Sequence, residues 1–142
     1  MKDMIYLEGI EEGRIYYIRS KDKRQYSVLV QPEAMEIIER HRGKKYLLNT
    51  LDKYDDYRNA TSIINKRLKD IAQLEDCKIS KKITTYYARH SWATIASRIG
   101  ISWDTIRYAL GHAGGSVTDI YIDYDLEQVD EANRKVIDFI KK

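Results

Sequence analysis

Near the amino terminus, apolar residues gather in two short runs that a polar loop separates. Residues 13–19 and 26–30 are rich in β-branched and aromatic side chains, which is typical of β-strands. A short, strongly basic loop at 20–25 lies between them. We therefore predict two antiparallel strands joined by this loop. Residues 2–7, with Gly9 just beyond, are expected to form the last turn of a helix.

Further along, the apolar positions change to helical spacing. Pro32 suits a first helical turn, and an apolar stripe follows it as far as Ile38. The stretch at 46–57 is less regular. After it, an apolar stripe from Ala60 to Leu74 predicts the longest helix of the chain.

Capping residues mark two helices in the second half. The segment from Thr85 to Arg98 is predicted to be helical and to stop at Gly100. Ser102 is a suitable N-cap for a helix over about 103–110, and Gly111 is a natural stop for that helix.

A short helix is expected to start at Ser116, with Asp119 in its first turn. The tail predicts an amphipathic helix over about 126–141, with its apolar positions at Leu126, Val129, Ala132, Val136, Ile137 and Ile140. The fold class expected from these patterns is mainly α, with a small antiparallel β-sheet near the amino terminus.

Length and composition indicate an ordinary globular protein. A chain of 142 residues with 43% hydrophobic and 33% charged residues predicts one domain over 1–142 and excludes a disordered polypeptide. No apolar run approaches the roughly 20 residues of a membrane helix, so no membrane partner is expected, and no secretion leader is visible. The single cysteine, Cys77, fits a reducing, cytoplasmic location.

The net charge of +3 says little, but the charges lie in alternating blocks. This arrangement fits a protein with one basic face, and it also fits a solvated surface of mixed charge. Charge alone favours the mixed surface. The basic blocks are 19–24, 40–45, 66–69 and 78–82, and the acidic blocks are 8–12, 52–56 and 123–131.

Three residues in the second half suit chemistry on a phosphodiester. Tyr121 offers a phenol, which becomes a nucleophile when nearby cations favour the phenolate. Arg89 offers a guanidinium, which binds two phosphate oxygens and keeps its charge at any working pH. His112 follows a helix-ending glycine, where it could donate a hydrogen bond to the phosphate, assist proton transfer, or bind helix-end carbonyls.

The basic loop offers further cations. Lys21 could protonate the departing 5′ oxygen, whereas Lys23 and Arg24 compete for that role or contact DNA phosphates. A plain charged turn is an equal alternative. No metal-binding constellation and no glycine-rich nucleotide loop are visible, so the sequence suggests neither a metal nor another cofactor.

The order of these residues resembles the catalytic half of the tyrosine recombinases, the phage-integrase family. Leu110-Gly111-His112, followed by Thr118 and Tyr121, is similar to the last motif of that family. The resemblance places Arg89 in the His-x-x-Arg box, His112 at the second histidine, Tyr121 at the nucleophile and Lys21 at the hairpin lysine. It spans about residues 3–125 and implies a catalytic-domain fold of this family.

The chain departs from the family pattern at two places. Tyr86 stands where the box has histidine, and tyrosine could still donate a hydrogen bond but does not carry a proton near pH 7. The family also has an earlier catalytic arginine, which by resemblance falls at or before Met1. We therefore expect a truncated catalytic domain, inactive by itself, that lacks the first arginine and the amino-terminal DNA-binding domain.

The resemblance implies strand cleavage and rejoining of double-stranded DNA through a covalent 3′-phosphotyrosine, without a cofactor. It also implies a synaptic tetramer of recombinase subunits, in which the final helix docks on a neighbour or packs within its own chain. A catalytically inactive DNA-binding or assembly module is the first alternative. A helical regulator that uses 102–110 as a recognition helix is the second.

Overall fold

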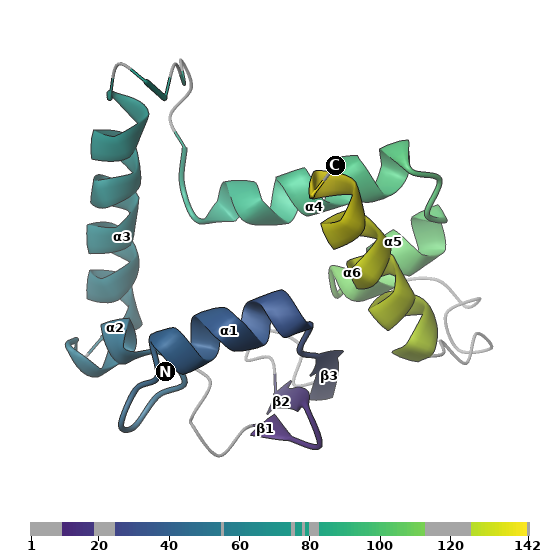
Figure 1. Ribbon diagram of the computed structural model, residues 1–142, viewed down its shortest axis with the longest axis horizontal. Coiled ribbons are helices and arrows are strands. Elements are labelled where there is room, and N and C mark those ends of the chain that lie inside the picture. The colour runs from purple at the N-terminus through teal and green to yellow at the C-terminus, as the bar shows by residue number, and fades with distance from the viewer. Residues whose placement is uncertain are drawn as a thin grey trace. The chain divides into compact units, whose positions relative to one another are not determined.

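The computed structural model describes residues 10–18, 25–54, 56–74, 76–77, 79, 83–112 and 126–141. The chain divides into two compact units, Met1–Tyr87 and Ala88–Lys142. Helices predominate, and one small antiparallel sheet lies near the amino terminus (Figure 1). The fold class expected from the sequence is thereby confirmed.

The sheet of the first unit has the strand order β1-β2-β3, with antiparallel pairing throughout. Tyr17 lies opposite Tyr26, and their rings stack with centroids 5.4 Å apart at 18°. The two predicted strands are confirmed as β2 and β3. The remaining strand, β1, was not predicted, because two residues are too few to show an alternating pattern. The strands are β1 (Ile10–Glu11), β2 (Arg14–Ile18) and β3 (Gln25–Leu29).

The helices of the first unit follow the apolar stripes. Helix α1 (Pro32–Arg40) has its proline in the first turn, as expected. Helix α3 (Tyr57–Ala72) is capped by the Asp56 side chain, which accepts a hydrogen bond from the backbone N–H of Arg58 at 3.0 Å. Two details were wrong: the single-turn helix α2 (Asn49–Asp52) lies in the stretch expected to be irregular, and α3 ends before Leu74.

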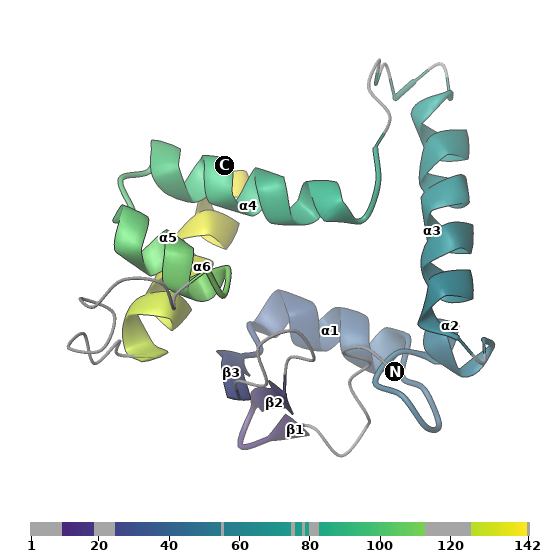
Figure 2. The ribbon, with the colours of Figure 1, turned by 180° about the vertical axis from the view of Figure 1, so that it is seen from behind.

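The described part of the second unit is helical (Figure 2). Helix α4 (Tyr86–Arg98), helix α5 (Trp103–Ala109) and helix α6 (Leu126–Ile140) agree with the predicted segments. The Ser102 side chain caps α5 by accepting a hydrogen bond from the backbone N–H of Thr105 at 3.1 Å. The helices expected at 2–7 and from Ser116 lie outside the described residues.

One residue from each helix forms the core of the second unit. Ala96 of α4, Ile106 of α5 and Val136 of α6 are all almost fully buried. Further apolar residues pack around them, namely Trp92, Ala93, Ile95, Ile99, Ile101 and Leu110. This cluster fixes how the three helices cross, and it therefore positions the ends of α4 and α5.

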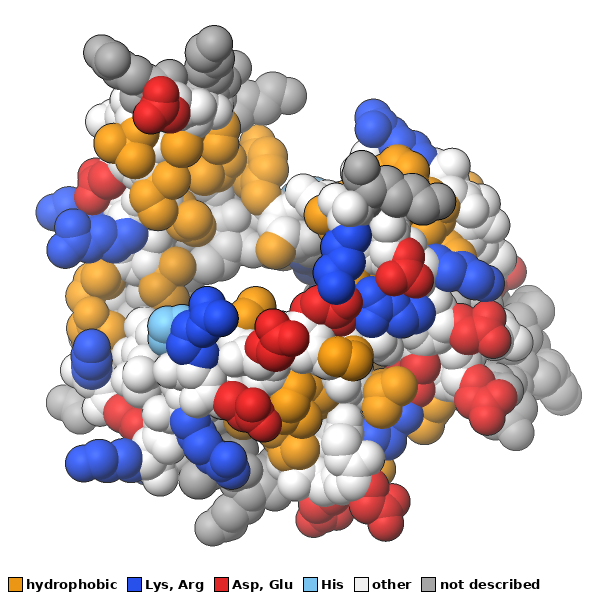
Figure 3. All heavy atoms as spheres, viewed as in Figure 1, with side chains coloured by type: hydrophobic (Ala, Val, Ile, Leu, Met, Phe, Trp, Pro, Cys, Tyr) orange, Lys and Arg blue, Asp and Glu red, His pale blue; other side chains and the backbone are white. Residues whose placement is uncertain are grey.

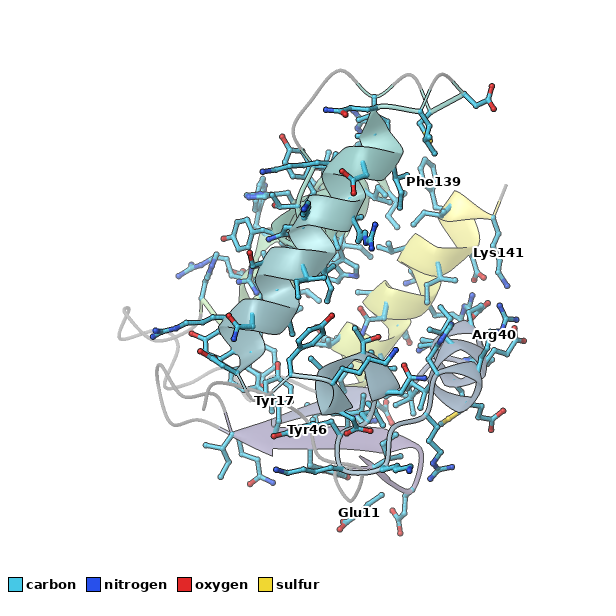
Figure 4. All side chains as sticks on the ribbon, turned by 90° about the vertical axis from the view of Figure 1, so that its left-hand side faces the viewer. Glu11, Tyr17, Arg40, Tyr46, Phe139 and Lys141 are labelled. Atoms are coloured by element: carbon cyan, nitrogen blue, oxygen red, sulfur yellow. The ribbon has the colours of Figure 1, made fainter. Side chains whose placement is uncertain are left out.

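The apolar face of α6 is only partly buried. Val129 and Ala132 are buried along with the core residue, whereas Phe139, near the end of the helix, is 46% exposed (Figure 4). Within the described ranges, no helix combines the length and the apolar character that crossing a bilayer requires.

Candidate active site

Arg89 extends from the start of α4 to the end of α5. Its Nη2 atom donates a hydrogen bond to the backbone carbonyl of Leu110. The same nitrogen lies 3.1 Å from Nε2 of His112, which is 23 positions away along the chain. Two residues with complementary phosphate chemistry are therefore in direct contact.

The turn after α5 brings His112 to this place. The N–H of Gly111 donates to the carbonyl of Tyr108 at 2.8 Å, and the N–H of His112 donates to the carbonyl of Arg107 at 2.8 Å. These two bonds form a Schellman motif at the C-terminal end of α5. The motif requires a residue with left-handed backbone angles directly after the C-cap residue. Gly111 meets the requirement with φ of 64°, since glycine has no Cβ to clash.

The guanidinium of Arg89 also suits the electrostatics of the helix end. The C-terminal end of a helix carries a partial negative charge on its unsatisfied carbonyls. A permanent cation bonded to the Leu110 carbonyl is stabilised there. Because Arg89 is half-buried and His112 is exposed, the contact lies at the surface of the second unit.

The contact defines the protonation state of His112 in this arrangement. A guanidinium only donates hydrogen bonds, so Nε2 of His112 must accept. The ring proton of a neutral imidazole then belongs on Nδ1. A ligand that replaces His112 as the acceptor for Arg89 would leave Nε2 able to take a proton.

Arg89 keeps donors for such a ligand. Both of its contacts use Nη2. Among the described residues, neither Nε nor Nη1 of Arg89 is within hydrogen-bond distance of an acceptor. A phosphate is well suited to these donors, because its oxygens match the planar fork of a guanidinium.

Tyr86 lies one helical turn before Arg89 on α4. Residues three apart on a helix occupy neighbouring positions on its surface, so the two side chains start from the same side of α4. Tyr86 is 58% exposed. The tyrosine of the Tyr-x-x-Arg sequence is therefore placed where it could contact a ligand of Arg89.

The family model described as "Phage integrase family" matches residues 8–128 of the chain. The chain belongs to the phage integrase family. The matched range includes the contact between Arg89 and His112, and the fold agrees with the catalytic domain of tyrosine recombinases.

Two relatives carry the name tyrosine recombinase XerC, and both come from Leptospira interrogans serogroup Icterohaemorrhagiae. They belong to serovar copenhageni (strain Fiocruz L1-130) and serovar Lai (strain 56601). Each is 30% identical over an alignment of 143 positions. The alignment covers 94% of this chain and 41% of the relative. The chain therefore spans about two fifths of the length of these relatives. No solved structure is significantly similar to the chain.

The other recombinase positions assigned from the sequence lie outside the described residues. These are the nucleophile position Tyr121, the hairpin lysine Lys21, and the phosphate-contact residues Lys23 and Arg24. Their roles stay predictions. Strands β2 and β3, which flank 19–24, are described and are paired up to Ile18 and Gln25.

The sequence patterns missed the role of the Leu110 carbonyl. Backbone groups do not appear in a motif, so the bond from Arg89 was not expected. The available signal was Gly111, because a glycine that ends a helix shows that exposed carbonyls lie next to it. Within the described ranges, no group of three His, Cys, Asp or Glu residues could hold a metal ion.

Proposed function

We propose that the chain is the strand-transfer part of a tyrosine recombinase, which cuts and rejoins double-stranded DNA at specific sites. The observation that carries the proposal is the contact between Arg89 and His112 at the end of α5. It joins a permanent cation and an imidazole at a surface where further guanidinium donors remain available. Membership of the phage integrase family and the similarity to tyrosine recombinases support the same function.

In the proposed reaction, the phenol oxygen of Tyr121 attacks a phosphorus atom of the DNA backbone. The bond between phosphorus and the 5′ oxygen breaks, the phenol loses its proton, and the 5′ oxygen gains one. The product is a 3′-phosphotyrosine and a free 5′ hydroxyl. A 5′ hydroxyl from another strand then reverses these steps, so the DNA is resealed without an external source of energy.

The residues have distinct roles in this reaction. Arg89 binds the non-bridging oxygens and offsets the negative charge that grows in the transition state. His112 donates a hydrogen bond to the phosphate or moves a proton, and Tyr86 donates a hydrogen bond in place of the usual histidine. Lys21 protonates the departing 5′ oxygen, while Lys23 and Arg24 contact phosphates of the DNA backbone.

The proposed partners are DNA in the cytoplasm and further recombinase subunits that form a tetramer around two DNA sites. Helix α6 is the proposed contact between subunits. Its residues Val129, Ala132 and Val136 are buried, whereas Leu126, Phe139 and Ile140 keep 39%, 46% and 64% exposure. A neighbouring subunit could cover this exposed apolar surface.

A duplex that carries a nick close to the cleavage site tests the proposal. After cleavage, the short piece that bears the 5′ hydroxyl diffuses away, and the protein stays bound to the DNA. Because the target is unknown, a pool of such duplexes with randomised sequence is used, and the trapped DNA is sequenced. The experiment uses both this chain and the same chain extended at its amino terminus by the corresponding segment of a tyrosine recombinase.

The expected result is a covalent adduct that resists denaturation, is lost in Tyr121→Phe and is kept in Tyr124→Phe. Tyr124 is a matched control, since it is a tyrosine three residues away. If neither the chain nor its extended form makes an adduct with any duplex of the pool, strand transfer is refuted.

An inactive DNA-binding or assembly module is the second candidate, and Tyr86 is the observation that favours it. A phenol replaces the imidazole of the usual histidine, which is the side chain that most often transfers protons at neutral pH. This candidate predicts sequence-specific binding without an adduct. It also predicts that Tyr86→His leaves adduct formation absent.

A further inference from the structure

The chain forms a tight turn directly after α1, which we call the basic turn and define as residues 40–45. The N–H of Asn49 donates to the carbonyl of His41 at 2.8 Å, and the N–H of Gly43 donates to the carbonyl of Leu47 at 3.2 Å. An antiparallel bridge pairs Arg42 with Leu48. The backbone on both sides of the turn is therefore held by hydrogen bonds.

The carboxylate of Asp52 accepts hydrogen bonds from backbone N–H groups at the end of the basic turn and directly after it. Its Oδ2 accepts a hydrogen bond from the N–H of Lys44, and its Oδ1 accepts from the N–H of Lys45 at 3.1 Å and of Tyr46 at 3.0 Å. These bonds favour the charged carboxylate, with the Lys44 bond having the largest effect, and they lower the pKa of Asp52.

Close packing also fixes the shape of the basic turn. A Cβ at Gly43 would lie 2.1 Å from the carbonyl oxygen of Tyr46, which is far inside van der Waals contact. Tyr46 and Leu47 are only 5% and 7% exposed, and they anchor the turn in the first unit. The backbone of the basic turn is therefore ordered before any ligand binds.

The side chains of the basic turn carry concentrated positive charge. Arg40, Arg42, Lys44 and Lys45 are all exposed. Figure 3 shows Lys and Arg side chains over the end of α1 and the loop that follows it, and Figure 4 shows Arg40 projecting outward. The ammonium of Lys45 also lies 5.2 Å from the centre of the Tyr46 ring, so part of this charge is held in place.

The charge of Lys44 interacts with that of Asp52, but the basic turn forms no close ion pair in the described part of the chain. Among the described residues, no carboxylate lies within ion-pair distance of the four side chains. Asp52, which belongs to α2, uses both carboxylate oxygens on backbone N–H groups. Three cations on the helices do have an acid one turn away, in the pairs Arg67–Asp70, Arg134–Asp138 and Lys135–Glu131.

We propose that the basic turn binds the phosphate backbone of double-stranded DNA, with residues other than Arg89 and His112. The proposal rests on the proposed function, which makes DNA the polyanion that this chain meets. DNA suits the turn because its charges repeat along each strand, so several cations can each meet a phosphate. The proposed contacts are to phosphates, which position the DNA and carry no sequence information directly.

A triple variant tests the proposal by removing charge while leaving the backbone bonds in place. Arg42→Gln, Lys44→Gln and Lys45→Gln are combined, since the turn is held through main-chain N–H groups and Asp52. The matched control combines Arg134→Gln, Lys135→Gln and Lys141→Gln, which removes the same charge from the end of α6. Far-UV circular dichroism and thermal unfolding check that both variants remain folded.

The measured quantity is the dissociation constant for a duplex at several salt concentrations. Each phosphate contact contributes about 0.9 to the slope of log Kd against log salt. Losing three contacts lowers the slope by about 2.7, so the rise in Kd between about 50 and about 200 mM salt shrinks about 40-fold. The control should change the slope by less than about 1. Hydroxyl-radical footprinting should show protection that the basic-turn variant loses and the control keeps.

Equal slopes of log Kd against log salt concentration for the basic-turn variant and the control would overturn the proposal. So would a wild-type affinity for anionic phospholipid vesicles that exceeds the affinity for duplex DNA at equal salt, because the turn would then be a membrane contact. The outcome is separate from the test of Tyr121. A wild-type adduct together with equal slopes refutes the basic turn alone, whereas a reduced slope without any adduct refutes strand transfer alone.

Discussion

In the proposed strand cleavage, replacing Gly111 by alanine should lower the rate far more than its effect on stability explains. Gly111 has φ of 64°, a region in which an L-residue costs about 1–2 kcal/mol. It lies between Leu110, whose carbonyl accepts a bond from Arg89, and His112, whose Nε2 contacts the same nitrogen. Any backbone shift that relieves the new Cβ therefore moves both partners of Arg89.

Gly100 provides the matched control at the end of α4. Its φ is 82°, and a Cβ placed there would meet nothing within 4 Å. The same two bonds end this helix, from the N–H of Gly100 to Ser97 at 3.2 Å and from the N–H of Ile101 to Ala96 at 3.0 Å. Gly100→Ala should therefore lower the free energy of unfolding by a similar 1–2 kcal/mol, roughly, and leave Arg89 in place.

Two measurements separate the effects on stability and on catalysis. Urea unfolding gives the free energy of unfolding, and the rate of adduct formation in a single turnover gives the chemical step. If one charge-assisted hydrogen bond of about 1.5–3 kcal/mol is lost, Gly111→Ala should cleave roughly 10- to 150-fold more slowly. Gly111→Asn should recover part of the rate, because asparagine tolerates the left-handed region better. Equal rate losses in the two alanine variants would refute the reasoning.

Three further predictions follow from single side chains. Arg89→Lys should slow adduct formation at least about 100-fold with little change in DNA affinity, because an ammonium lacks the planar fork. Ile106→Ala should lower the free energy of unfolding by about 2–5 kcal/mol in urea, whereas Trp103→Ala, at a side chain that is 70% exposed, should change it by under about 0.5 kcal/mol. Because folding lowers the pKa of Asp52, its stabilisation is complete above the unfolded value of 3.8 and is lost as the pH falls through the folded value. Acid titrations of unfolding should therefore show wild type losing more stability over this range than Asp52→Asn.

Each of these predictions has a contradicting result. Normal cleavage by Arg89→Lys would show that charge alone suffices at this position. Equal effects of the changes at Ile106 and Trp103 would show that Ile106 is not a core residue. Parallel acid titrations of wild type and Asp52→Asn would show that the basic turn does not depend on the carboxylate.

The sequence predicted most helices and strands because their apolar positions keep a clear period. Strands β2 and β3, the proline start of α1 and the caps around α5 all depend on residues close in sequence. Strand β1 and helix α2 were missed, since two and four residues are too short for a periodic signal. The end of α3 was placed too late because Leu74 continues the apolar stripe beyond the last helical residue.

By itself, the sequence determined which chemical groups are available and in what order. It singled out Arg89, His112 and Tyr121 from residue type and spacing, and it gave Gly111 as a helix stop. Only the tertiary structure decided that Arg89 meets the Leu110 carbonyl and His112. The physical reason is that this contact joins two helices, and the packing of Ala96, Ile106 and Val136 sets how those helices cross.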